Sequence, residues 1–199
     1  MSPTTSTLLA TLIAVIVFAA FVKLSNPHRE FSTQEYWRTA TIESIKEIPD
    51  EALKPGNRNG GILMWAAIAS NDPDILTALV KRGADINEAD VIFKGTPLTG
   101  AASFSSNPDI IDRLIELGAN IHQKVHYDED ALMIAARQSN SPAIIKRLVF
   151  HGADIYRKNS NDETAFDIAK YGNNKITMDV LDELMKSSSN RNNLPEENH

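Results

Sequence analysis

The sequence contains no cysteine among its 199 residues. Disulfide bonds, a catalytic thiol and a zinc site built on cysteine are therefore excluded, because each of them requires the sulfur atom. The redox compartment is not fixed by this absence, since proteins in either environment can do without disulfides.

Positive charge is also scarce. The chain has 20 Lys and Arg against 26 Asp and Glu, which gives a formal net charge of −6 at pH 7. Binding to nucleic acid depends on neutralising phosphates with Lys and Arg, and no basic stripe is present in the sequence. We therefore expect no nucleic-acid partner.

A nine-residue phrase occurs three times, as LVKRGADIN at residues 79–87, LIELGANIH at 114–122 and LVFHGADIY at 148–156. Ten residues before each Gly lies a Pro, and ten residues before each Pro lies a Leu (Pro73, Pro108, Pro142; Leu63, Leu98, Leu132). Apolar residues at i, i+1 and i+4 after the Pro predict a helix that ends at the Gly. The Ala-rich stretch after each Leu predicts a preceding helix that a neighbour can approach closely. Because one such helix pair cannot bury its apolar face alone, the units must stack.

These units resemble the ankyrin repeat family, whose unit of about 33 residues carries a Thr-Pro-Leu-His-x-Ala turn and helix start. The closest copy is TPLTGAA at residues 96–102, with looser copies at 61–67, 130–136 and 164–169. The family's His is replaced in the four copies by Met64, Thr99, Met133 and Asp167, which predicts weaker turns but the same fold. The resemblance covers about residues 33–187 and implies an all-α solenoid of stacked helix-turn-helix units joined by short connector fingers.

The predicted repeat domain covers residues 33–186 and ends in two atypical units, because each end unit must shield one face from water. The units are an N-terminal cap at 33–60, three repeats at 61–94, 95–128 and 129–161, and a C-terminal cap at 162–186. Residues 25–32 are predicted to be a linker. Residues 187–199 are predicted to be a disordered tail, because only Leu194 offers an apolar side chain to bury.

The N-terminal segment, residues 1–24, is predicted to contain one hydrophobic helix. Residues 8–22, LLATLIAVIVFAAFV, approach the ~20 apolar residues that a membrane span needs. Ten of them are Leu, Ile, Val or Phe, which together favour insertion by about 3 to 6 kcal/mol. We expect a membrane anchor. The alternative is a cleaved signal peptide with the cut after Ala19, although no Lys or Arg precedes the apolar run as such a peptide would require.

Two observations bear on the side of the membrane that carries the repeats. Lys23 and Arg29 follow the span and no basic residue precedes it, which favours the cytoplasmic side. The opening YWRTAT at residues 36–41, however, resembles bacterial ankyrin proteins that are commonly exported. We expect a single-pass protein of the bacterial inner membrane with its repeats on the exported, periplasmic side. The alternatives are repeats on the cytoplasmic side, or a cleaved and secreted protein.

The sequence offers little catalytic chemistry. His122 and His126 are four residues apart, but they lie in a connector, where this spacing does not bring two rings together as it would on a helix. Gly60 and Gly61 lie in a turn between units and do not follow a strand, as a phosphate-binding loop would. His151 precedes the Gly that ends its helix and is expected to interact with the carbonyl end of that helix. We predict a non-enzyme without a cofactor, a metal or a small-molecule substrate.

Positions that differ between the copies are candidates for recognition. In ankyrin proteins the partner usually contacts the connector fingers and the exposed, concave side of the first helices. The first finger, residues 88–95, carries three adjacent apolar residues where a polar tip is expected, and we predict a contact patch. The alternative is an inward-folded local cluster. These residues are Val91, Ile92 and Phe93.

Four further residues are predicted to contact the partner: Phe104, Arg137 and Tyr171 after the Ala pairs, and Tyr127 in the second finger. All are of types enriched at binding hot spots. Filling of the core is the alternative for Phe104. The residue that corresponds to Gly100 in the previous unit is Trp65, and its indole is predicted to occupy the space that Gly100 leaves open.

The sequence therefore predicts a membrane-tethered protein–protein interaction module. It would bind a protein partner through its concave face and connector fingers, and a basic partner would associate faster with an acidic chain. The alternative is an immunity or inhibitor protein that neutralises a toxin or hydrolase acting at the membrane. An enzyme would need convergent polar groups in one pocket, which the sequence does not indicate.

Overall fold

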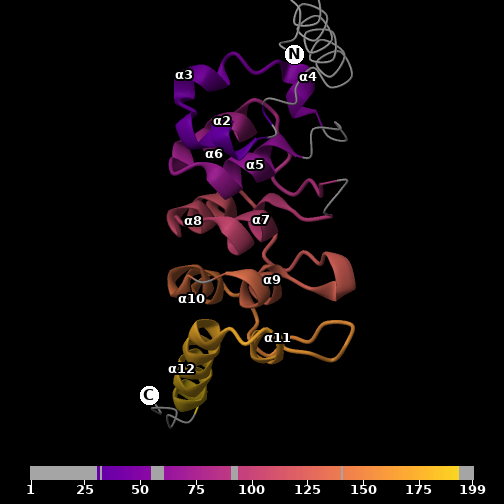
Figure 1. The fold of residues 1–199 in the computed structure, drawn as a ribbon, viewed down its shortest axis with the longest axis vertical. Coiled ribbons are helices and arrows are strands. Elements are labelled where there is room, and N and C mark those ends of the chain that lie inside the picture. The colour runs from indigo at the N-terminus through magenta and orange to yellow at the C-terminus, as the bar shows by residue number, and fades with distance from the viewer. Residues whose placement is uncertain (1–30, 32, 55–60, 91–93, 140, 193–199) are drawn as a thin grey trace, which may run out of the picture.

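The computed structural model describes residues 31, 33–54, 61–90, 94–139 and 141–192. Within these ranges the chain is helical and contains no strand, and Figure 1 shows pairs of helices stacked along one axis. This arrangement confirms the predicted all-α solenoid. The apolar segment 8–22 lies outside the described residues, and among the described helices none combines the length and the hydropathy of a membrane span.

The helices form two rows. The first-helix row contains α2 (Gln34–Thr39), α5 (Ile62–Ala69), α7 (Pro97–Phe104), α9 (Ala131–Gln138) and α11 (Ala165–Tyr171). The second-helix row contains α3 (Ile42–Ile45), α6 (Pro73–Lys81), α8 (Asp109–Glu116), α10 (Pro142–Phe150) and α12 (Lys175–Asn192), while α4 (Asp50–Leu53) follows α3. Each helix packs against its neighbours in the same row, so the rows run side by side down the stack (Figure 1).

The Gly of each repeated phrase ends a second helix. Gly83, Gly118 and Gly152 have φ values of +97°, +97° and +96°, the left-handed conformation that glycine adopts without strain. The amide of the following Ala then donates to the carbonyl five residues earlier, for example from Ala84 to Leu79 at 3.1 Å. The chain therefore turns towards a finger at the same place in each repeat.

The core is built from the repeated apolar positions. Both Ala residues of each pair in α5, α7 and α9 are 0 % exposed, and Leu63, Leu98 and Leu132 are at most 3 % exposed. Small side chains at these positions let consecutive first helices pack closely, as the Ala pairs predict. One helix pair therefore completes its core only against the next pair.

Loss of the family's His does not leave most of the turns uncapped. Thr96 and Thr99 form a reciprocal capping box at α7, and Thr164 and Asp167 form another at α11. At α9 the Asp130 carboxylate accepts from the Met133 amide at 3.0 Å. Only the α5 copy, which begins at Gly61, has no side-chain cap among these four.

Side chains also tie neighbouring units together. The Asn87 amide donates to the Gly118 carbonyl at 3.2 Å and its oxygen accepts from the Asn120 amide at 2.8 Å. Arg82 at the end of α6 reaches back to the Ile48 carbonyl and the Asp50 carboxylate, both at 2.5 Å. Such contacts fix the rotation of one unit on the next, which positions the fingers.

The last unit ends the stack with a charged residue. Lys170 occupies the place of Ala67, Ala102 and Ala136, and it is exposed because no helix pair of the described residues lies beyond α11 and α12. Helix α12 then continues to Asn192, so residues 187–192, predicted to belong to a disordered tail, are helical. Residues 193–199 lie outside the described part of the chain. Adding residues to a helix that has already formed costs little free energy, which accounts for the extension. In the extension the Ser187 hydroxyl also donates to the Glu183 carbonyl at 2.9 Å.

Candidate functional site

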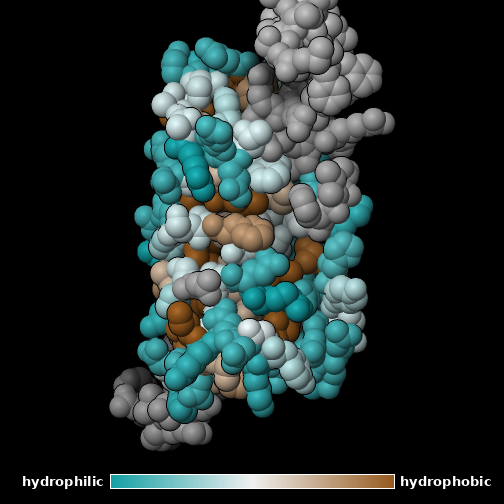
Figure 2. Space-filling model, in the orientation of Figure 1, coloured by the Kyte–Doolittle hydropathy of each residue, from teal (hydrophilic) through white to brown (hydrophobic). Residues whose placement is uncertain are grey.

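A groove of about 510 Å³ lies between the first-helix row and the second finger. Figure 2 shows apolar residues gathered on the middle of the stack, at the level of α7 and α9, while hydrophilic residues dominate the surface elsewhere. The groove is lined by residues of α2, α5, α7 and α9, by the end of the first finger and by the second finger: Gln34, Met64, Trp65, Ile68, Gly95, Thr99, Gly100, Ser103, Phe104, Val125, His126, Ile134 and Gln138.

At the groove, the middle repeat carries small residues where its neighbours carry large ones. Gly100 of α7 corresponds to Trp65 of α5 and Ile134 of α9, and Ser103 corresponds to Ile68. Both Gly100 and Ser103 belong to the lining of the groove. Large side chains of the two adjacent helices form its walls.

Gly100 also permits a close approach, although not by the predicted side chain. A Cβ atom at Gly100 would lie 2.8 Å from Met64 Cγ and 3.2 Å from Ile68 Cδ1. Met64 and Ile68 therefore fill the space beside Gly100, and the prediction that the Trp65 indole fills it is wrong. Trp65 instead is half-buried and lines the groove.

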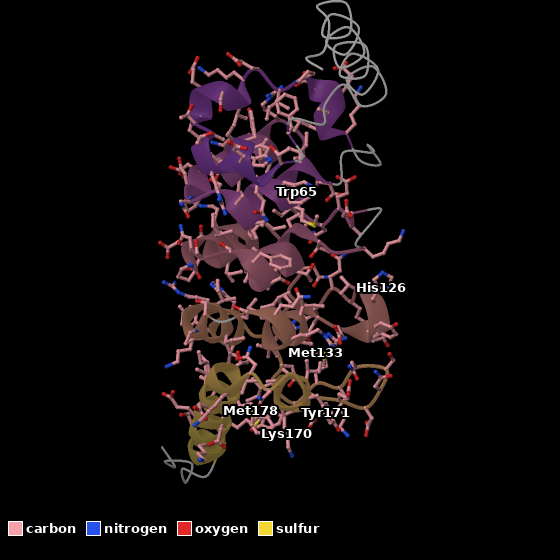
Figure 3. The ribbon with its side chains drawn as sticks, viewed as in Figure 1. Trp65, His126, Met133, Lys170, Tyr171 and Met178 are labelled. Atoms are coloured by element: carbon pink, nitrogen blue, oxygen red, sulfur yellow. The ribbon has the colours of Figure 1, made fainter. Side chains whose placement is uncertain are left out.

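Of the predicted contact residues, Phe104 is the one that lines the groove. Its side chain is 61 % exposed, so it does not fill the core. Tyr127 is exposed beside the groove residue His126, with 6.4 Å between the ring centroids. Tyr171 is exposed on α11, and Figure 3 shows it far down the stack from Trp65. Val91, Ile92 and Phe93 lie outside the described residues.

Arg137 lies on α9 but does not line the groove. Its guanidinium pairs with the carboxylate of Glu129, whose side chain is 5 % exposed. This pair ties α9 to the base of the second finger. The Arg137 side chain remains 47 % exposed and accessible to a partner.

The second finger has an unusual backbone that presents His126 to the groove. The finger contains a single turn of 3-10 helix, η2 (His126–Asp128), in which Tyr127 and Asp128 both have φ of +59°. Non-glycine residues in this conformation cost roughly 1–3 kcal/mol each and persist only where neighbouring contacts hold them. Here the Tyr127 carbonyl accepts from both the amide and the hydroxyl of Ser160, at 3.0 and 2.8 Å. Figure 3 shows His126 on this finger.

A buried ion pair connects the second finger to the third. Asp130 is 2 % exposed, and its carboxylate receives a 2.8 Å bond from Arg157, which also donates to the Asp128 carbonyl at 3.0 Å. Both carboxylate and guanidinium are thus engaged in holding the fingers. The pair therefore holds the second finger against the third.

The histidines have structural surroundings. His122 and His126 are exposed, and within the described residues no three His, Cys, Asp or Glu side chains gather as metal ligands. The ring of His151 lies 2.8 Å from an Asp112 oxygen of the preceding unit, and Asp112 also pairs with Arg147. This carboxylate partner on α8 was not expected from the sequence, although His151 does lie at the C-terminal end of α10 as expected.

One carboxyl group has a clearly altered acidity. The hydroxyl and the amide of Thr164 both donate to Asp167, and these hydrogen bonds lower the pKa of the Asp167 carboxyl from its usual 3.8. Asp167 belongs to the capping box of α11, so the shift reflects a turn that stabilises the fold.

None of the thirteen lining residues of the groove is Asp, Glu, Lys or Arg. The acidity of the chain therefore lies elsewhere, and the groove offers no charge that would attract a basic partner. Sequence reasoning placed Val125 and His126 on the second finger and Gln138 on the concave side but did not choose them as contact residues, and it assigned Trp65 to packing. The available signal was the small pair Gly100 and Ser103 between repeats with bulky residues at the same positions.

Together, the stacked helix pairs, the fingers and the groove define a helical repeat solenoid with a recessed side. Residues 63–159 match the protein family described as ankyrin repeats (3 copies), so the three central units that form most of the groove are ankyrin repeats. Proteins built from such repeats generally mediate protein–protein interaction, and they are typically not enzymes. A comparison with curated proteins found no match.

Proposed function

We propose that this chain is a non-enzymatic interaction module that binds a protein partner in the groove and against the fingers, and that residues 8–22 hold it at a membrane. The observation that carries the proposal is an uncharged, apolar groove with Phe104 61 % exposed at its side, within three ankyrin repeats. An exposed aromatic side chain that adjoins an apolar groove extends the apolar surface, and continuous apolar surface of this kind is a feature of interaction sites.

The surroundings of the groove support binding by a preorganised surface. The second finger is held by Ser160 and by the Asp130–Arg157 ion pair, so a partner meets His126 and Tyr127 in fixed positions. Fixing a loop before binding reduces the conformational entropy lost on association. Arg137 and Tyr171 would contact a partner that extends beyond the groove towards α11. Val91, Ile92 and Phe93 would do so from the first finger.

The membrane part of the proposal rests on the sequence of residues 8–22, which is apolar and free of charge. We place the repeats on the exported side of a bacterial inner membrane, because the start of the repeat domain resembles exported ankyrin proteins. The partner is then a protein of that compartment or a domain of another membrane protein that faces it.

The test is a pull-down from detergent-solubilised membranes of the source cells with the full chain, its Phe104→Ser variant and a matched Phe150→Ser control. Phe150 is 80 % exposed but lies at the end of α10 in the second-helix row, away from the groove. We expect Phe104→Ser to weaken capture of the partner by about tenfold or more, as loss of a hot-spot residue does, and Phe150→Ser to have no effect.

Equal capture by the two variants would refute the groove as the binding surface. The identity of a partner that depends on Phe104 distinguishes the two kinds of module. A toxin or hydrolase whose activity falls on binding would indicate an immunity or inhibitor protein, whereas any other partner would indicate a scaffold.

A further inference from the structure

The floor of the groove has the features of a pocket for one kind of side chain. The part of the groove lined by Gly100 and Ser103 of α7 is called the depression below. The lining of the same groove includes two aromatic side chains from different units, Trp65 of α5 and Phe104 of α7. Aromatic rings pair favourably with a further ring in edge-to-face or offset arrangements. The depression therefore favours an aromatic occupant over an aliphatic one.

The absence of charge in the lining restricts the occupant further. A Lys, Arg, Asp or Glu side chain that entered the groove would lose its hydration and would find no charged residue as a partner. An uncharged side chain loses little hydration free energy when it enters the groove. The lining thus disfavours a charged side chain as the occupant and favours an apolar ring.

Several polar atoms of the groove remain able to bond to a ligand. The Ser103 hydroxyl gives its proton to the Thr99 carbonyl at 2.9 Å, which leaves its oxygen as an acceptor. The side chains of Gln34, His126 and Gln138 make no hydrogen bond to other described residues. A ring with a polar tip would therefore find both an apolar wall and hydrogen-bonding groups, and tyrosine and tryptophan are the side chains of this kind.

We propose that the depression over Gly100 and Ser103 is a specificity pocket for one tyrosine or tryptophan side chain of the protein partner. This inference rests on the proposed function, since it names the residue type that the same groove recognises. The partner segment contributes the anchor, and the surrounding contacts with the fingers place that segment.

The test begins with a random dodecapeptide library screened against the full chain held in a lipid nanodisc. We expect the enriched peptides to share one Tyr or Trp. One enriched peptide is then synthesised with its anchor unchanged, and with the anchor replaced by Ser or by Lys. Both replacements should weaken binding by about tenfold or more, measured by fluorescence anisotropy.

Two variants of the protein complete the experiment. Ser103→Leu fills the depression, while Ser187→Leu is a matched control, because the Ser187 hydroxyl also donates to the carbonyl four residues earlier but is exposed on α12. Ser103→Leu should reduce peptide binding to the level of the anchorless peptide, with no further loss when the two changes are combined. Ser187→Leu should bind as the unchanged protein does.

A second measurement needs no variant. The chain has two tryptophans, and Trp37 is 1 % exposed with its indole N–H donated to the Phe31 carbonyl at 2.7 Å. In nuclear magnetic resonance spectra, peptide binding should shift the indole N–H signal of Trp65 and leave that of Trp37 in place. This result holds even if Ser103→Leu fails to fold.

The inference is overturned if no peptide is enriched, if the enriched peptides share no Tyr or Trp, or if the Trp65 signal does not move. Should Phe104→Ser still abolish capture of the cellular partner in that case, the interaction module stands and only the pocket assignment fails. If Phe104→Ser leaves capture unchanged, the proposed function itself fails.

Discussion

Replacing Gly100 by Val tests the packing that shapes the groove. A Cβ at this buried position would lie 2.8 Å from Met64 Cγ and 3.2 Å from two carbons of Ile68, closer than unstrained contacts allow. Overpacking of this kind costs about 1–3 kcal/mol. Removing a glycine from a helix interior returns roughly 0.5 kcal/mol. The net loss in the free energy of unfolding should therefore be about 1–2 kcal/mol.

The assay is thermal and urea unfolding of the full chain in a mild detergent, followed by circular dichroism. A loss of this size lowers the melting temperature of a chain of this length by roughly 2–8 °C. Gly172→Ala is the control, because a Cβ there would meet carbonyl oxygens no closer than 3.4 Å. That variant should be as stable as the unchanged chain or slightly more stable.

A double variant identifies the side chain responsible for the loss. Met64→Ala removes the atom nearest to the new Cβ, so the loss for Gly100→Val together with Met64→Ala should be smaller than the sum of the separate losses by about 1 kcal/mol. An unchanged melting temperature for Gly100→Val, or strict additivity with Met64→Ala, would refute this account of the packing.

Three further changes test the contacts that hold the units. Asp130→Ala should lower the free energy of unfolding by about 3–5 kcal/mol, because it removes a helix cap and leaves the Arg157 charge without its buried partner. Asp130→Asn should lower it less, because the Asn side chain keeps an acceptor for the cap. Equal urea midpoints for the two variants would contradict this. Asp167→Ala should cost about 1 kcal/mol at neutral pH. Thr164 lowers the pKa of Asp167 below 3.8 in the folded state, so the stabilising effect of the carboxylate is complete above pH 3.8 and disappears as the pH falls below the lowered pKa. The difference in free energy of unfolding between the variant and the unchanged chain should therefore shrink in acid. A difference independent of pH would show that the charge of Asp167 contributes nothing. Asn87→Ala removes two hydrogen bonds between units and should lower stability by about 1–2 kcal/mol, which an unaltered urea midpoint would disprove.

The repeat architecture could be read from the sequence because its signals are local. The Pro that starts a second helix, the Gly that ends it and the Ala pairs act within one or two turns, and each recurs at the same interval. The structure bears this out in the caps at Gly83, Gly118 and Gly152 and in the buried Ala residues. The end of α12 was harder to predict, because low hydrophobicity at residues 187–192 does not prevent a helix already formed from continuing.

The site was predicted only in part. Phe104 was predicted correctly as a residue on the concave side, because it is aromatic and follows an Ala pair in the first helix of its unit. Trp65 was wrongly assigned to the space beside Gly100. The assignment compared the same position in two units, and this comparison does not reveal that a neighbouring residue, Met64, occupies that space. The carboxylate partner of His151 was not predicted either, because it lies 39 positions earlier in the chain.

The sequence alone determined the class of fold, the order of the units and the absence of thiol chemistry, because each of these depends on residue types and on spacings within a unit. The tertiary structure alone decided where the stack is hollow, which aromatic rings face that hollow and which charges are already paired. The groove combines side chains from four helices and a finger, and the distances between them are set by the packing of units that lie about 35 residues apart in the chain.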